Sequence, residues 1–200
     1  MDDFAVDLAR RTMKELGGNR PVGAPELAGV AKLLLLAGHV SPTQMLTLGA
    51  LTLLEEERTW YTALHKDPAR TPAVVEELLR HITVKQFGLI RRATRDTVIG
   101  GVVIGEGQWV ICSLRAGAYA PHGRPADYRF DPLGHQGDHL AFGHGPHQCL
   151  GQSLSRVILE AGLTVLARGL PGLHLAAGRQ LLPFRDSKTV YGVESLPVAW

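Results

Sequence analysis

The segment of the sequence best suited to chemistry is HLAFGHGPHQCLGQSL, residues 139–154. It holds a single thiol, Cys149, in a glycine-rich turn directly before a predicted helix. Free N–H groups and the dipole at a helix N-terminus favour an anionic sulfur. Glycines such as Gly143, Gly145 and Gly151 let the backbone adopt positive φ or approach a flat, bulky group. Because a thiolate in an apolar turn is a soft anionic ligand, the segment predicts an iron site at Cys149.

Two other interpretations of the cysteines stay open. A lone cysteine is most often a small buried hydrophobic side chain, and we favour that interpretation for Cys112. Zinc is an alternative metal for Cys149. Structural zinc sites are built mainly from several cysteines at short fixed spacings, whereas this segment holds one thiol. The histidines that make zinc an alternative are His135, His139, His144 and His147.

The composition argues against several functional classes. The chain has 200 residues, 45% of them hydrophobic, which suffices for one domain with a sizeable core. Its 21 basic and 19 acidic side chains nearly balance, so no nucleic-acid partner is expected. Two cysteines do not indicate a disulfide-stapled secreted fold.

The N-terminal segment and the apolar runs give no sign of a membrane. MDDFAVDLARR lacks the apolar stretch of a signal peptide. The most apolar run, residues 33–37, is far too short to span a bilayer. The sequence therefore predicts a soluble, cytoplasmic protein with reduced cysteines that does not enter a membrane.

A long helix is predicted upstream of the thiol segment. From Pro25 to about Leu54, apolar residues recur at intervals of three and four on nearly all sides, which is typical of a helix buried in a core. Pro42 interrupts this helix. Because Pro42 cannot donate an N–H to the carbonyl of Gly38, a kink or widened groove is expected there.

The other elements are shorter. Helices are predicted over 2–16, 72–81 and 151–170. A long ordered loop is predicted over 116–141, and strand-like pieces over 181–200. The last helix has an apolar face of Leu154, Val157, Ile158, Ala161 and Val165. Short β-branched runs separated by glycines predict hairpin strands at 89–90, 97–99, 102–104 and 109–111.

Residues 142–151, FGHGPHQCLG, resemble the heme-binding signature of the cytochrome P-450 family. They match every fixed position of its pattern, Phe-Gly-x-Gly-x-His-x-Cys-x-Gly. The resemblance implies that Cys149 is the axial ligand of a heme iron and that His147 contacts a heme propionate. It implies that the remaining cofactor-binding residues of the loop are Phe142, Gly143 and Gly145.

Two further motifs resemble the same family. Glu77-Leu78-Leu79-Arg80 matches its Glu-x-x-Arg, which implies a structural role for Glu77 and Arg80 in a buried network. Without the resemblance they would be a modest pair on a helix surface. Arg91 falls where the family has an arginine that pairs with a heme propionate, whereas Arg92 is expected at a solvated strand end. A buried propionate needs such a charged hydrogen-bond partner.

Residues 34–41, LLLAGHVS, resemble the oxygen-binding segment on the long central helix of the family. The resemblance implies that Gly38 and Ser41 are catalytic. Val40 stands where the family has an acid, and Ser41 where it has a threonine. Those groups deliver protons to oxygen; Ser41 keeps a hydroxyl, but Val40 has no proton to transfer.

The resemblance also implies a fold and a cofactor. The fold is mainly α with small β-sheets (α+β), like the C-terminal half of the cytochrome P-450 fold of bacterial soluble type. It comprises a long central helix, the Glu-x-x-Arg helix, the heme-thiolate loop and the following helix. Residues 1–200 are expected to form a single partial heme domain whose N-terminal half is absent. The implied cofactor is heme b, iron protoporphyrin IX.

The implied activity is that of a monooxygenase, which inserts one atom of O2 into a small organic substrate. Electrons would come from a ferredoxin-type or flavin-containing reductase, because the sequence holds no dinucleotide or flavin motif. The second hypothesis is a truncated, inactive member of the family that acts as a binding or scaffolding partner. Val40 and the missing half favour this hypothesis. Exposed apolar surface would then invite a partner, either the missing N-terminal half or another protein.

Overall fold

The computed structural model describes residues 23–85, 87–88, 90–119, 128–134 and 139–200, together with Arg11 and Lys14. Of the helix predicted over 2–16, only those two residues are therefore described. The chain divides into two compact units, residues 1–43 and residues 44–200. The predicted fold class, mainly α with small β-sheets, is confirmed.

The long helix predicted from Pro25 to about Leu54 is confirmed as α2, Ala24–Glu55. It continues through Pro42, and the hydroxyl of Thr43 donates a hydrogen bond to the carbonyl of His39 at 2.7 Å. The kink expected at Pro42 stays a prediction. No helix within the described residues, α2 included, has the length and apolar character needed to cross a membrane.

The expectation that α2 is buried along its whole length is wrong for its first part. From Met45 to Leu54 most side chains are buried in the core of the second unit. In the first unit, Leu33, Leu35 and Leu36 are 65%, 58% and 67% exposed. The described part of that unit is a single helix segment apart from Arg11 and Lys14, and one helix cannot bury apolar side chains on all its sides.

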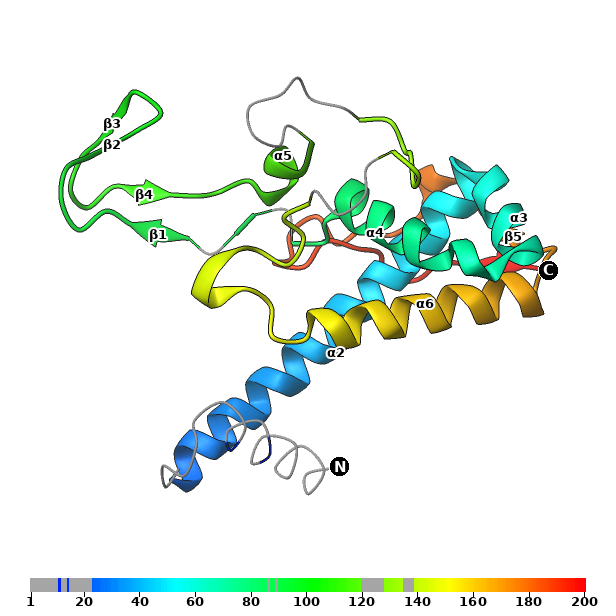
Figure 1. Cartoon of the computed structure of the whole chain (residues 1–200), viewed down its shortest axis with the longest axis horizontal. Coiled ribbons are helices and arrows are strands. Elements are labelled where there is room, and N and C mark those ends of the chain that lie inside the picture. The colour runs from blue at the N-terminus through cyan, green and yellow to red at the C-terminus, as the bar shows by residue number, and fades with distance from the viewer. Residues whose placement is uncertain are drawn as a thin grey trace. The chain divides into compact units, whose positions relative to one another are not determined.

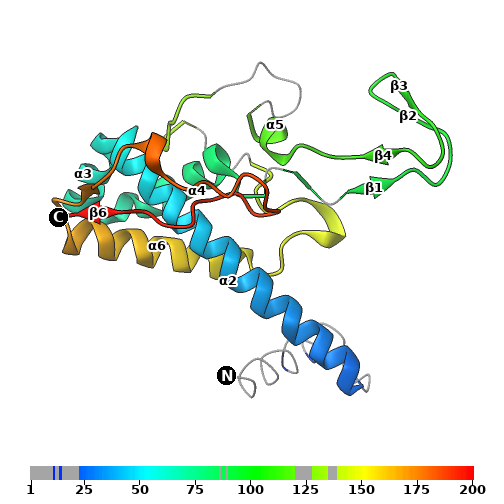
Figure 2. The same cartoon turned by 180° about the vertical axis from the view of Figure 1, so that it is seen from behind.

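Helices form the core of the second unit. α3 (Arg58–Lys66) and α4 (Thr71–Ile82) both pack against α6 (Gln152–Gly169), and Figures 1 and 2 show α4 and α6 side by side. The helices predicted over 72–81 and 151–170 are thus confirmed to within one residue at each end. A short 3-10 turn, η1 (Pro68–Arg70), connects α3 to α4. The core cluster includes Met45, Leu48, Leu51, Leu53, Tyr61, Leu64, Val74, Val75, Leu78, Leu159 and Leu163.

α6 buries a different face from the one that its sequence pattern marks. The buried stripe is Leu159, Leu163 and Ala167, spaced by four residues and at most 3% exposed. Both stripes have helical spacing, so the pattern alone does not decide which one packs. The predicted face is largely solvent-exposed, with values of 63%, 60%, 37% and 70% for Leu154, Val157, Ile158 and Val165.

α4 ends at a left-handed residue that hydrogen bonds hold in place. Thr83, the C-cap of α4, has φ of 43°, which is unusual for a β-branched side chain. Its N–H donates to the carbonyl of Leu79 at 3.2 Å, and its hydroxyl donates to the same carbonyl at 3.0 Å. These bonds satisfy a free carbonyl at the helix end and stop α4 before the strands begin.

Within the described part of the unit, three two-stranded antiparallel sheets accompany the helices. β1 (Arg91–Arg92) pairs with β4 (Trp109–Val110), and β5 (His174–Leu175) pairs with β6 (Val198–Ala199). β2 (Thr97–Ile99) pairs with β3 (Val102–Ile104) across a turn in which Gly100 and Gly101 have φ of 57° and 82°. Such left-handed values at both turn positions favour glycine. Figures 1 and 2 show the β2–β3 hairpin extending away from the helices of the unit.

Some predicted elements differ from the observed ones. The strands predicted at 97–99 and 102–104 are confirmed, and the strand predicted at 109–111 ends at Val110. The prediction of a strand at 89–90 is wrong for Ile90, because the observed strand β1 begins at Arg91. Leu89 lies outside the described residues. The loop predicted over 116–141 begins within a helix, α5 (Leu114–Tyr119), and its residues 120–127 and 135–138 are not among those described. The strand-like pieces predicted in the tail are confirmed by β6 and by the isolated bridge between Phe184 and Val193, and the 3-10 turn η4 (Arg179–Leu181) precedes them.

Candidate functional site

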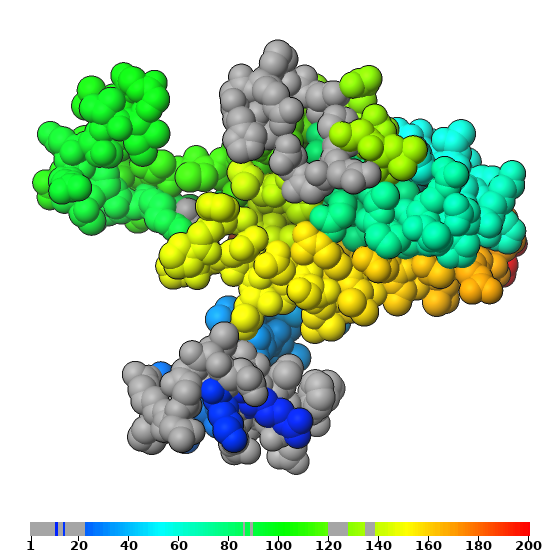
Figure 3. Space-filling view, viewed as in Figure 1, coloured from blue at the N-terminus to red at the C-terminus, as the bar shows by residue number. Residues whose placement is uncertain are grey.

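The loop before α6 folds back on itself and presents Cys149 at the surface. The N–H of Gly143 donates to the carbonyl of Leu140, and that of Cys149 donates to the carbonyl of Phe142, each at 2.9 Å. Gly143 and Gly145 have φ of 71° and 80°. The 3-10 turn η3 (Gly145–His147) then leads into Cys149, whose side chain is exposed. In Figure 3 the yellow atoms of this loop and of the first turns of α6 lie at the surface of the second unit.

The loop around Cys149 borders open space and exposes an apolar side chain next to the thiol residue. A Cβ placed on Gly143, Gly145 or Gly151 would meet no other atom within 4 Å, so the loop backbone borders free space. Leu150 is 58% exposed beside the sulfur. One soft sulfur donor in a loop that borders open space suits a flat macrocycle with a single protein ligand. The residues present therefore fit a heme.

The zinc alternative finds no support among the described residues. They include no group of three or more His, Cys, Asp or Glu side chains placed to hold a metal ion. His139 contacts Glu76 instead, and His144 and His147 are exposed. His135 lies outside the described residues.

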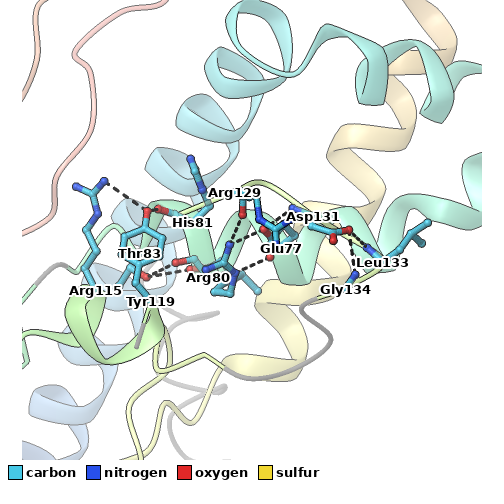
Figure 4. Close-up of polar contacts among 11 residues, drawn as sticks. Glu77, Arg80, His81, Thr83, Arg115, Tyr119, Arg129, Asp131, Leu133 and Gly134 are labelled. Carbon is cyan, nitrogen blue, oxygen red and sulfur yellow. Dashed lines mark hydrogen bonds and ion pairs between the residues drawn. The ribbon is translucent and has the colours of Figure 1, made fainter. Parts of the chain in front are cut away.

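Glu77 and Arg80, both on α4, form a buried charged network (Figure 4). Two guanidinium nitrogens of Arg80 donate to the two carboxylate oxygens of Glu77, each at 2.7 Å, and the side chains are 2% and 1% exposed. Arg80 also donates to the carbonyl of Arg129 at 2.6 Å, and the N–H of Asp131 donates to Glu77 at 2.8 Å. This pairing satisfies charges that would be costly if buried alone.

An aromatic side chain connects the same helix to α5. The hydroxyl of Tyr119 donates to the carbonyl of His81 at 2.5 Å, and Arg115 donates to the Tyr119 hydroxyl at 3.4 Å, as Figure 4 shows. The guanidinium of Arg80 lies 5.4 Å from the centre of the Tyr119 ring. The sequence analysis missed these partners and those contributed by residues 129–131. Several of them are backbone groups, which any residue type supplies, so no sequence signal could have found them.

A second carboxylate on α4, Glu76, contacts residues on both sides of the Cys149 loop. Arg156 on α6 donates to its two oxygens at 2.5 and 3.0 Å, and His139 Nε2 lies 3.2 Å from the second oxygen. Burial raises the pKa of Glu76, but the hydrogen bonds from His139 and Arg156 outweigh it and lower the pKa to about 2. The hydrogen bond to Glu76 raises the pKa of Arg156 against the opposing effect of burial, and the charges of Glu76 and Glu160 raise it further.

The sequence analysis gave no role to Glu76 or Arg156. A weak signal was present, because Glu76 is adjacent to the motif residue Glu77. The partner could not be identified, since Arg156 is 80 residues away in the chain. His139 was considered only as a zinc ligand.

The structure brings some of the predicted site residues together and leaves others apart. Phe142, Gly143, Gly145, His147 and Cys149 share one loop. Arg91 is exposed on β1, opposite Val110, and its predicted contact with a propionate stays a prediction. Gly38 and Ser41 are on α2 in the first unit, a separate compact unit from the one that holds the loop.

Cys112 and Arg92 are both exposed in the structure. The expectation that Cys112 is buried is wrong: its side chain is exposed, although its carbonyl accepts the N–H of Gly88 at 2.8 Å, and both cysteines are free. Arg92 is exposed as expected. Its Nε donates to the carbonyl of Gly107 at 3.0 Å, and its guanidinium lies 5.8 Å from the centre of the Trp109 ring.

Comparison with known proteins gives one consistent family. The family model described as cytochrome P-450 matches residues 33–168. The chain is 43% identical to cytochrome P-450 105C1 of a Streptomyces species over 175 residues, which make up 88% of this chain and 46% of that relative. The chain thus spans about half the length of the curated relatives it matches.

Solved structures agree with the sequence relatives. The chain is similar to cytochrome P-450 MoxA from Nonomuraea recticatena with a TM-score of 0.82 and 35% identity, covering 99% of this chain and 52% of that one. It is similar to the mycinamicin VIII C21 methyl hydroxylase MycCI from Micromonospora griseorubida, solved with mycinamicin VIII bound. There the TM-score is 0.84 at 34% identity, covering 99% of this chain and 54% of the other.

Proposed function

The chain belongs to the cytochrome P-450 family, and from that premise we propose that Cys149 binds the iron of a heme as its axial thiolate ligand. The observation that carries this proposal is an exposed thiol held in a loop closed by the hydrogen bond from its own N–H to Phe142. A heme with a thiolate ligand supplies oxygen chemistry when bound, because the sulfur donates electron density to the iron.

The other loop residues receive roles that follow from their positions. The backbone at Gly143 and Gly145 borders open space, so a ring system can approach it closely. His147 is exposed two residues before the thiol, and Arg91 is exposed on β1. We assign both to heme propionates, which need charged or polar hydrogen-bond partners. The proposed cofactor is heme b, and Phe142 contributes to its binding loop.

The proposed activity is oxygen insertion into a small organic substrate. Ser41 would hold and pass a proton at the oxygen site, and Gly38 would leave room there for O2. A ferredoxin or flavin reductase would supply the electrons. Because relatives are about twice as long, we propose that turnover needs the remaining half of the fold as well. We further propose that residues 1–200 act as one partial heme domain in the cytoplasm.

A second candidate function is binding or scaffolding without catalysis. The observations that favour it are Val40 in place of a proton-carrying acid and the exposed apolar face of α6. In that case a truncated chain would associate through its apolar surface with the missing half or with another protein.

The test of the proposed function is a comparison of the two exposed cysteines. The chain is loaded with hemin, reduced, treated with carbon monoxide, and its Soret band is recorded. We expect the red-shifted band of a thiolate-ligated heme in the wild type and in Cys112→Ala, and its loss in Cys149→Ala. Failure of the wild type to take up heme would overturn the proposal and leave the binding function.

A further inference from the structure

The carboxylate of Glu76 joins the two sides of the Cys149 loop to α4. On the upstream side it contacts His139, ten residues before the thiol, with 3.2 Å between Nε2 and the carboxylate. On the downstream side it accepts two hydrogen bonds from Arg156, at 2.5 and 3.0 Å. Two-pronged bonds between a guanidinium and a carboxylate are strong and fix geometry.

On the upstream side, a chain of contacts through His139 connects Glu76 to the backbone of Cys149. The N–H of Ala141 donates to Nδ1 of His139 at 3.3 Å, so the proton of a neutral ring lies on Nε2, facing Glu76. The His139 side chain is 3% exposed. Ala141 precedes Phe142, whose carbonyl accepts the N–H of Cys149 at 2.9 Å.

Contacts of Arg156 on α6 reach the Cys149 loop from the downstream side. The guanidinium carbon of Arg156 lies 4.7 Å from the centre of the Phe142 ring. Its Nη1 donates to the side-chain oxygen of Gln152 at 3.3 Å, which also accepts from the amide of Gln148 at 3.4 Å. Gln148 is the residue before Cys149. The contacts therefore form a closed circuit that passes through the backbone of Cys149.

We propose that Glu76 is a positioning residue for Cys149, acting through His139 and Arg156 to fix the direction in which the sulfur points. This network uses partners different from those of the Glu77–Arg80 pair. The effect of Glu76 on heme ligation rests on the proposed function of Cys149. The effect of Glu76 on the geometry of the loop does not depend on a bound heme.

The first test uses the chain without heme and measures amide hydrogen exchange. In Glu76→Gln, we expect the amides of Gly143 and Cys149 to exchange at least about tenfold faster, relative to core amides of Val75 and Leu163, because their protection depends on the closed loop. The matched control is Glu55→Gln, which removes a carboxylate from the exposed ion pair with Arg179. Equal acceleration of loop and core amides, or no acceleration, would overturn the proposal.

Arg156→Lys provides a milder variant in case Glu76→Gln fails to fold. Lysine keeps the charge but cannot make two parallel bonds to the carboxylate. We expect loop exchange faster than in the wild type and slower than in Glu76→Gln. Wild-type exchange rates in the loop of this variant would contradict the proposal.

The second test uses the heme-loaded chain. At equal heme content, we expect the carbon monoxide complex of Glu76→Gln to show a smaller fraction of the red-shifted thiolate band than that of Glu55→Gln. Equal fractions would overturn the consequence for the heme. If the wild type binds no heme, the proposed function fails, and the exchange experiment still decides whether Glu76 positions the loop.

Discussion

At the scale of single residues, the ion pair of Glu77 and Arg80 illustrates how a charge is made tolerable in a core. Each side chain is at most 2% exposed, and each has further backbone partners near Arg129 and Asp131. Removing one partner takes away the opposite charge that lies closest to the other. The pair is therefore expected to matter for folding more than a surface pair of the same spacing would.

The corresponding prediction is that Glu77→Ala lowers the free energy of unfolding by about 3–5 kcal/mol, because the buried Arg80 guanidinium loses the carboxylate that makes two hydrogen bonds with it. Urea unfolding followed by circular dichroism measures this. Arg70→Ala, which breaks an exposed pair with Asp67, serves as the control and should cost below about 1 kcal/mol. Similar losses in the two variants would contradict the account.

His81 gives the second prediction at this scale, a pH dependence. Burial lowers the pKa of His81, and the charges of Arg80 and Arg115 lower it further, against the opposing charge of Glu77. Its Nδ1 is buried and finds no hydrogen-bond partner among the described residues. Because the unfolded chain then binds a proton more readily than the folded one, stability falls as the pH drops below the ordinary histidine pKa.

We therefore expect the urea midpoint of the wild type to decrease between pH 7.5 and pH 5.5, and to decrease less in His81→Gln. Other groups titrate in both proteins, so the difference between the two slopes isolates His81. If the urea midpoint of His81→Gln falls as steeply with pH as that of the wild type, this histidine does not cause the pH dependence of stability.

The residues of the Cys149 loop were predictable because their chemistry is local. A thiol, several glycines and a following helix occur within a short stretch of sequence. The Glu76–His139–Arg156 network was not predictable in the same way. Its members are 63 and 80 residues from Glu76 in the chain, and tertiary packing, which places α6 with Arg156 against α4, brings them together.

At the scale of elements, α6 has two apolar stripes of which one is buried. Leu163 is 1% exposed in the core, whereas Val165 on the other side is 70% exposed. The sequence marks α6 as a helix reliably, because both stripes repeat every three or four residues. It does not mark the packed side, since that depends on where α3 and α4 lie.

The prediction from this asymmetry compares two alanine substitutions on the same helix. Leu163→Ala should lower the free energy of unfolding by about 2–5 kcal/mol, because it leaves a cavity in the core. Val165→Ala should change it by less than about 0.5 kcal/mol. Thermal or urea unfolding measures both, and equal losses would mean that the packed face has been assigned wrongly.

The ends of helices could be predicted from the sequence where a residue such as proline marks them. Pro72 in the first turn of α4 marked its start to within one residue. The helix α5 was missed because it has only 6 residues and begins shortly after β4 ends at Val110. A helix this short shows less than two full turns of apolar periodicity. Its formation depends on the tertiary contacts of Tyr119.

At the scale of the whole molecule, apolar side chains remain uncovered on several elements of the second unit. The stripe on α6 is one, and the β2–β3 hairpin is another, with Val98, Val102 and Val103 between 64% and 72% exposed. Large exposed apolar patches usually mark interaction sites. This surface is consistent with a chain that spans about half the length of its relatives.

The matching prediction concerns binding of the apolar dye ANS. The isolated chain should enhance ANS fluorescence, and Val157→Lys combined with Val165→Lys should reduce the enhancement, because charge replaces an exposed apolar surface. Ser153→Lys, exposed on the same helix, adds charge without removing an apolar side chain and is the control. An unchanged signal in the double variant would contradict a role of the α6 stripe as accessible apolar surface.

The central claim is a bond between the sulfur of Cys149 and a heme iron, and X-ray absorption at the iron edge of the hemin-loaded chain tests it most directly. The account predicts one sulfur atom in the first coordination shell of the wild type and of Cys112→Ala, and none in Cys149→Ala. A first shell of nitrogen and oxygen alone in the wild type, or a sulfur shell that persists in Cys149→Ala, would contradict it.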